Sequence, residues 1–227
     1  MSYRALTSVQ VSQFRSDGFI SIQNGLTHQD LDQLRVCVKT ILADPSRYTR
    51  TKKDSAQVFR SNLELGWLGW RNSTFADWIH RCATHLIGAD VAIWFSQVLI
   101  SPKTHGAGSP WHQDAAYGAQ YDTPGSISCW IPLQRVDVTS GCMHFEKGGH
   151  QKGIIAQDPI HAHHAEAFPP PDQDQVVACP MNCQSVLFHH ARAPHMTRPN
   201  TSKRDRCTVI VRFTHPDYTP VRPDALH

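Results

Sequence analysis

The protein has 227 residues, of which 40% are hydrophobic and 18% are charged. This composition supports a sizeable buried core and excludes a disordered or fibrous chain. The formal net charge of +3 is too small to indicate nucleic acid or an acidic membrane surface as the main partner. The length favours one domain over residues 1–227, because two ordinary enzyme domains with a linker need a longer chain.

The location of the protein is inferred from what the sequence lacks. Its longest apolar run, which contains residues 91–94 and ends before Ser96, is far shorter than the roughly 18 residues of a membrane-spanning helix. The first residues show neither the apolar stretch nor the cleavage site of a secretory signal, so we expect a cytoplasmic protein. The seven cysteines have no paired zinc-site spacing, and we expect them to be small buried apolar residues without a chemical role.

Helical patterns dominate roughly the first 90 residues. Helices are predicted over residues 7–18, 27–45 and 74–88, because each segment begins at Ser or Thr and ends at or near Gly or Pro. The second and third segments also place their apolar residues on one face. Between the first two helices, residues 19–24 alternate as a short strand. We expect this part of the chain to support a core built mainly by later residues.

From about residue 91 to about residue 220 the pattern changes to short β-type runs. They cover residues 91–102, 126–136, 142–147, 184–191 and 207–215, and Gly and Pro interrupt them. Because no helical pattern separates these runs, they favour a β-sandwich, jelly roll or barrel over a parallel sheet. Residues 157–175 are rich in His, Pro and Asp, and we interpret them as a long surface loop that could form a lid.

The main chemical signal is the pair His112 and Asp114, which one residue separates. On a strand, side chains two residues apart project to the same face, so the imidazole and the carboxylate can reach one point. Two histidines and one carboxylate leave three positions open on Fe(II), the arrangement of non-haem iron oxygenases. By itself the pair is weak evidence, and a third ligand is needed.

A second signal lies near the carboxyl end, in residues 187–213. His195 follows a strand-like run and precedes a turn with Pro199 and Asn200, after which the next strand carries Arg206. Such a hairpin can deliver a metal ligand and a guanidinium into one cavity. Arginine suits a carboxylate because it donates two parallel, charge-assisted hydrogen bonds.

These residues resemble the phytanoyl-CoA dioxygenase family of Fe(II)/2-oxoglutarate-dependent oxygenases. The resemblance covers nearly the whole chain: the opening at residues 6–27, the His112-x-Asp114 pair, residues 129–153, and the closing pattern from His195 to Arg206. It implies a mainly β fold with N-terminal helices around a double-stranded β-helix, a cupin-like jelly roll. One departure is Lys147-Gly148-Gly149-His150, where the family often has Pro-Gly-Ser-His.

The resemblance also implies roles for single residues. His112, Asp114 and His195 bind iron, and Arg206 holds the far carboxylate of 2-oxoglutarate, which is consumed with O2. Thr197 adds a hydrogen bond to this cosubstrate. In some members a Trp at the position of Trp130 and a polar group at the position of Gln97 line the same pocket, so these two are weaker candidates.

Other basic residues are assigned to no site. His150, His189 and His190 are expected to be structural, and the cluster His161, His163 and His164 is not expected to bind a physiological metal. Residues 192–212 carry six Lys or Arg against the single acid Asp205, which indicates either a small anionic ligand or a solvated basic face. Lys103, Arg60 and Arg71 could meet an anionic group, but the sequence does not place them.

The expected activity is the oxidation, most simply the hydroxylation, of an unactivated carbon of a small molecule, with release of succinate and CO2. A carboxylate at position 114 argues against a halogenase, since related halogenases lack it to make room for halide. Two alternatives stay open: a catalytically silent binding or partner subunit, and a cupin-like metal isomerase or hydrolase without 2-oxoglutarate. Substrate identity and oligomeric state cannot be read from the sequence, because fold and cofactor do not fix them.

Overall fold

The structure is a computed structural model that describes residues 3–44, 49–53, 56–61, 73–104, 106–118, 121–155 and 170–218. Its helices are α1 (Ser8–Asp17), α2 (His28–Ala43) and α4 (Thr74–Ile87). The predicted caps are present: the side chains of Thr7 and Thr27 accept hydrogen bonds from backbone N–H groups of the first turns. Gly18 and Gly88 end α1 and α4 with φ of 85° and 74°, a left-handed conformation that favours glycine. None of the helices in these ranges is long and apolar enough to cross a membrane.

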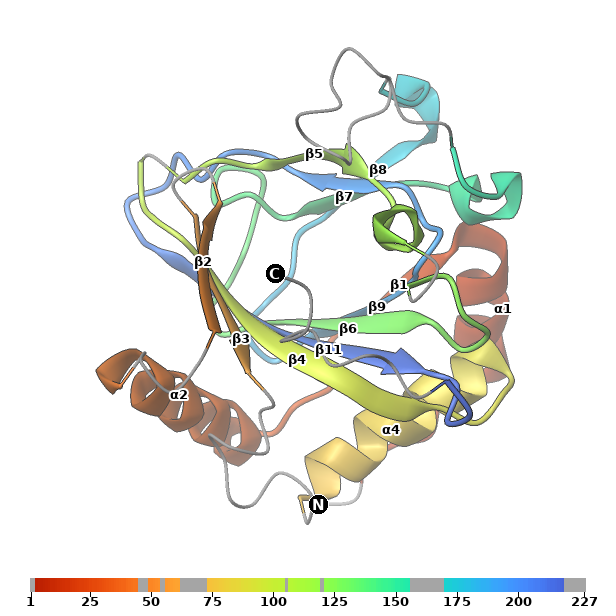
Figure 1. The fold of residues 1–227 in the computed structure, drawn as a ribbon, viewed down its shortest axis with the longest axis horizontal. Coiled ribbons are helices and arrows are strands. Elements are labelled where there is room, and N and C mark those ends of the chain that lie inside the picture. Colours follow the sequence, from red (N-terminus) through yellow and green to blue (C-terminus); the bar gives the residue numbers. More distant parts are fainter. Residues whose placement is uncertain are drawn as a thin grey trace.

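The strands form two antiparallel sheets that lie face to face (Figure 1). The seven-stranded sheet has the order β1-β9-β6-β11-β4-β3-β2, and the four-stranded sheet has the order β5-β10-β7-β8. This arrangement confirms the predicted jelly-roll core. The strands are β1 (Phe19–Ile22), β2 (Thr49–Lys53), β3 (Ala56–Ser61), β4 (Ala92–Ser101), β5 (Ser109–His112), β6 (Ile127–Pro132), β7 (Met143–Glu146), β8 (Val176–Cys179), β9 (Val186–His190), β10 (His195–Thr197) and β11 (Arg206–Thr214).

The sequence did not predict β2 and β3, which lie within the part expected to be mainly helical. The β2 sequence TRTKK contains no apolar residue, so it shows no hydrophobic alternation. It is a strand because β3 pairs with β4, for example Val58 opposite Leu99, and β2 extends the sheet by one more strand. Most of the predicted lid segment, namely residues 157–169, lies outside the described residues. At the end of the segment, η7 (Gln173–Gln175) is a short 3-10 helix.

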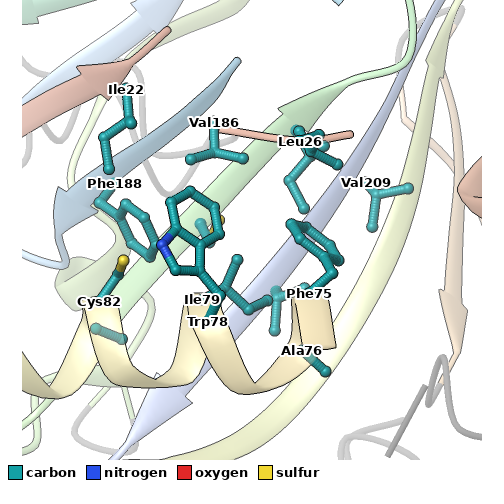
Figure 2. Close-up of a cluster of buried hydrophobic side chains, with 14 of the residues drawn as sticks. Ile22, Leu26, Phe75, Ala76, Trp78, Ile79, Cys82, Val186, Phe188 and Val209 are labelled. Atoms are coloured by element: carbon teal, nitrogen blue, oxygen red, sulfur yellow. The ribbon is translucent and has the colours of Figure 1, made fainter. Parts of the chain in front are cut away.

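The two faces of the larger sheet have different tasks. Alternate residues of β6, β9 and β11, such as Cys129, Phe188 and Val209, point to the helices and form one apolar cluster with them. Figure 2 shows Phe75, Trp78 and Ile79 of α4 packed against this face. The intervening residues face the smaller sheet, where Trp130, Leu187 and Ile210 pack against Phe145. The helices therefore support the sheet from outside and leave the space between the sheets for chemistry.

Candidate metal centre

Three candidate ligands converge between the two sheets. His112 is the last residue of β5, Asp114 begins the 3-10 helix η3 (Asp114–Tyr117), and His195 is the first residue of β10. Because β10 pairs with β5 and places His195 directly opposite His112, the two imidazoles lie on one face with ring centroids 4.1 Å apart. The pairing of two strands more than 80 residues apart in the chain brings the predicted set together.

The geometry of these side chains suits a single metal ion. One ligand atom from each residue can be chosen so that all lie within 4.8 Å of one another, and all three residues are buried. The Nδ1 atoms of His112 and His195 lie 2.8 and 2.9 Å from the backbone carbonyls of Pro110 and Ala193. A carbonyl only accepts, so each Nδ1 carries the proton and donates it. The Nε2 lone pairs therefore remain available for a metal.

Asp114 is held by groups that the sequence did not single out. Arg212 donates to both carboxylate oxygens, with Nη2 2.8 Å from Oδ1 and Nη1 in close contact with Oδ2, and the Ser128 hydroxyl donates to Oδ2 at 3.1 Å. Burial raises the pKa of Asp114, but the positive charge of Arg212 outweighs it, so the pKa lies far below its usual range. The carboxylate is thus ionised and its orientation is fixed.

Arg206 begins β11, and its side chain is almost fully buried. Nη1 donates to the carbonyl of Gly141, whereas none of the described residues accepts a hydrogen bond from Nε. Burial lowers the pKa of Arg206 to about 10, because no carboxylate among the described residues compensates the lost hydration. An ordered guanidinium with an unused donor fits an anionic ligand that is absent from the polypeptide.

Thr197, Trp130 and Gln97 are the remaining candidate pocket residues. Thr197 is buried, and its hydroxyl accepts a hydrogen bond at 3.0 Å from the backbone N–H of Ser109, so it helps to join β10 to β5. Trp130 and Gln97 both lie opposite Ile210 on neighbouring strands and so belong to the sheet face that points between the sheets. Trp130 is buried in the apolar cluster there, and Gln97 is half-buried. Their register agrees with the predicted side of the pocket.

Gln113, between the two ligands of the His-x-Asp pair, was also missed. Its buried amide donates to the carbonyls of Gly153 and Arg192 at 2.8 and 2.7 Å and accepts from the N–H of Ile155 at 2.8 Å. Gln113 therefore anchors the segment that carries His112 and Asp114 to two later parts of the chain.

The sequence contained one signal for Arg212 and Ser128. Arg212 lies six residues after Arg206 on β11, and Ser128 lies two residues before Trp130 on β6. An even spacing on a strand places both side chains of each pair on the same face of the sheet.

Among the residues set aside, His189 is buried, and its Nδ1 lies 3.9 Å from Oδ2 of Asp114. Burial lowers the pKa of His189 to about 4, so the ring is neutral near pH 7. His150 and His190 lie together, with ring centroids 5.5 Å apart. His161, His163, His164 and Arg71 lie outside the described residues, and Lys103 is exposed.

Comparisons with known proteins agree with this geometry. The model of the family Phytanoyl-CoA dioxygenase (PhyH) matches residues 14–208. A methylphosphonate hydroxylase of Gimesia maris is 25% identical over 215 residues, which are 92% of this chain and 80% of that protein.

Solved structures share the fold at low identity. The epimerase SnoN, in complex with Fe3+, alpha ketoglutarate and nogalamycin RO, has a TM-score of 0.75 and 22% identity, over 91% of this chain and 82% of its own. EvdO2 from Micromonospora carbonacea var. aurantiaca, complexed with 2-oxoglutarate, has a TM-score of 0.72 and 21% identity, over 93% and 92% of the two chains. The chain belongs to the phytanoyl-CoA dioxygenase family and is an oxidoreductase that uses iron and 2-oxoglutarate.

Proposed function

We propose that this protein hydroxylates an unactivated carbon of a small molecule and converts 2-oxoglutarate and O2 to succinate and CO2. We assign His112, Asp114 and His195 to the metal and Arg206 to the far carboxylate of 2-oxoglutarate. The observation that carries the proposal is the buried His-Asp-His set together with the buried Arg206 guanidinium, which has a donor that no described residue uses. A metal isomerase or hydrolase has no need for that guanidinium.

The residues fit the metal and the cosubstrate. Two neutral imidazoles and one carboxylate are the donor set that Fe(II) oxygenases use, and such a set leaves positions for other ligands. When bound together, iron, 2-oxoglutarate and O2 supply the oxidising power that the side chains themselves lack. The protein contributes orientation: backbone carbonyls fix both histidine rings, and Arg212 with Ser128 fixes Asp114. Burial of all three ligands keeps bulk water away from the reacting groups.

Two observations favour hydroxylation over other oxidations: the carboxylate of Asp114 and the similarity to the Gimesia maris hydroxylase. Asp114 occupies the position that a halide would need. The Gimesia maris relative is a hydroxylase of a small molecule, and it is similar over most of both chains. The SnoN epimerase shares only the fold, so its reaction does not transfer to this protein.

The test is an anaerobic titration of metal-free protein with Fe(II) and then 2-oxoglutarate, followed by the weak visible charge-transfer band of an iron-bound keto acid. We expect the band with the unchanged protein and none with Asp114→Ala. Asp32→Ala is the matched control, because Asp32 is a mostly exposed carboxylate paired with Arg35 on α2. Candidate small molecules are then screened by succinate release.

Each outcome separates the alternatives. A band in the unchanged protein and the Asp32→Ala control only, with succinate released on adding a substrate, supports the proposal. Iron binding without a band points to the isomerase or the silent subunit. Full activity of Asp114→Ala means that the ligand assignment is wrong.

A further inference from the structure

Arg212 is a second arginine on the inner face of β11. It lies six residues after Arg206, so both side chains project into the space between the sheets, at positions about 20 Å apart along the strand at ~3.4 Å per residue. Arg212 lies opposite Phe95 of β4 and Ser128 of β6. The candidate metal ligand Asp114 contacts Arg212 directly, so this guanidinium lies at the reacting end of the site.

The contacts of Arg212 leave one edge of its guanidinium unused. Nη1 and Nη2 face the two oxygens of Asp114, and Nη1 also lies 3.3 Å from the Ser128 hydroxyl. Nε is buried and has no hydrogen-bond partner among the residues that the structure describes. A guanidinium has five N–H donors, and the pair on Nε and Nη2 forms a second edge of the same fork geometry. Asp114 occupies the end edge, so the side edge remains for another oxyanion.

Arg206 gives a parallel on the same strand. Its Nε is also buried and finds no partner in the described part of the chain, and the proposed function supplies one in the far carboxylate of 2-oxoglutarate. Buried donors are rarely left unpaired in native proteins, and an orphan indicates a missing ligand or water. By the same reasoning, the Nε donor of Arg212 indicates a second missing ligand. This ligand is not 2-oxoglutarate, which is held at Arg206.

The surroundings of Arg212 are aromatic and lead from the metal ligands to the surface. Its guanidinium carbon lies 5.5 Å from the ring centre of Phe95 and 5.8 Å from that of Tyr121. The ring of Tyr117 lies 5.6 Å from Tyr121 and 6.1 Å from His112, and Tyr117 is 38% exposed. These rings hold the cation in place and form an apolar wall beside it.

The net charge of the loaded site, counted over the described residues, also favours an anion. Fe(II), the Asp114 carboxylate and the doubly charged 2-oxoglutarate together carry one negative charge, which Arg206 neutralises. Arg212 then leaves one positive charge in a buried site. Because a buried charge is costly without a partner, the remaining ligand, the substrate, is expected to carry a negative charge.

We propose that the side edge of Arg212 binds an oxyanion of the substrate, so that the substrate is a small carboxylate or phosphonate. Since Arg212 contacts the candidate metal ligand Asp114, the oxyanion group would bind near the metal. This inference rests on the proposed function and specifies its substrate class.

The test uses the charge-transfer band of the anaerobic Fe(II) and 2-oxoglutarate complex, which shifts when a molecule enters beside the metal. Two oxyanions are titrated, each against a neutral molecule of similar shape: propionate against propionamide, and methylphosphonate against methanesulfonamide. We expect at least one oxyanion to bind tenfold or more tightly than its neutral counterpart. The carboxylate and phosphonate arms show which oxyanion the site prefers. This comparison uses the unchanged protein and does not depend on any variant.

Arg212→Lys is the diagnostic variant, because it keeps a positive charge near Asp114 but loses the planar fork. We expect it to lose about tenfold or more in oxyanion affinity, as for one charge-assisted bond, with little change for the neutral molecules. Arg192→Lys is the control, because the Arg192 side chain is half-exposed and pairs with Asp122, which is not a candidate metal ligand. A Co(II) titration of each variant reports whether the metal site is intact.

Two kinds of result contradict the proposal, and they are distinguishable. If the band forms but oxyanions bind no better than the neutral molecules, or not at all at millimolar concentration, the Arg212 subsite is refuted while the proposed function stands. Equal oxyanion affinity in Arg212→Lys and the unchanged protein has the same meaning. If no band forms in the unchanged protein, the proposed function fails and the subsite falls with it.

Discussion

Replacing Arg206 with Met should make the protein more stable and a worse binder of 2-oxoglutarate. Arg206 is almost fully buried, and burial lowers the pKa of its guanidinium to about 10. Relative to an ordinary arginine this corresponds to a cost of about 3 kcal/mol for keeping the charge in the folded protein. Met fills a similar volume without a charge, but it leaves the Gly141 carbonyl unpaired, which costs about 1–2 kcal/mol.

The difference between these two terms predicts that, without ligands, Arg206→Met has a free energy of unfolding about 1–2 kcal/mol higher than the unchanged protein. This corresponds to a Tm that is roughly 2–8 °C higher. The pKa of Arg206 is depressed, so the cost of its charge is fully present below about pH 10 and fades as pH rises further. Measurements near neutral pH therefore include the whole effect.

The same substitution removes the proposed partner of the cosubstrate carboxylate. Losing one member of a buried charge pair costs about 2–5 kcal/mol, which corresponds to a roughly 30-fold or larger rise in the 2-oxoglutarate concentration at half-saturation. The assays are urea unfolding of metal-free protein and titration of the charge-transfer band, with Arg206→Lys as the charged control. A metal-free Arg206→Met that is less stable than the unchanged protein refutes the energy argument, and an unchanged titration midpoint refutes the assignment of Arg206.

Three further predictions concern other parts of the molecule. Gln113→Ala should lower the free energy of unfolding by about 2–4 kcal/mol, because three partly buried backbone groups lose their hydrogen-bond partner. Urea unfolding should show this loss, while an exposed Gln29→Ala control stays within about 0.5 kcal/mol. Ile79→Ala should lower the free energy of unfolding by about 2–5 kcal/mol in the same assay, because this residue of α4 is fully buried. It should not move the midpoint of the 2-oxoglutarate titration, because it packs on the side of the larger sheet that faces the helices, and a large shift of that midpoint would contradict the separate roles of the two sheet faces. Burial lowers the pKa of His190 to about 4, so its neutral ring favours folding above about pH 6.5, and this contribution is lost as the pH falls toward 4. Between these pH values His190→Gln should therefore lose roughly 2–3 kcal/mol less stability than the unchanged protein, and identical pH profiles of the two would contradict this prediction.

The sequence by itself predicted the elements whose residues carry a local signal. All three helices begin and end within about two residues of the prediction, because Thr7, Thr27 and the two terminal glycines act on their own neighbours. The long strands β4, β6, β9 and β11 were recognised by their apolar and β-branched residues. The candidate metal ligands and Arg206 were selected from their spacing and from the family resemblance, and the structure brings the three candidate ligands together.

Only the tertiary structure determined the features that depend on a partner far away in the chain. The strand β2 has no apolar pattern and exists because β3 and β4 offer it a sheet edge. Asp114 and Arg212 are 98 residues apart, so their ion pair is invisible until β11 and the ligand segment come together. The three hydrogen bonds of Gln113 likewise need segments that follow it by 40 to 79 residues. Helix ends and strand preferences depend on neighbouring residues, so a short stretch of sequence is enough to predict them. The pairing of strands and the neutralisation of buried charges depend on packing between distant segments, which no short stretch of sequence contains.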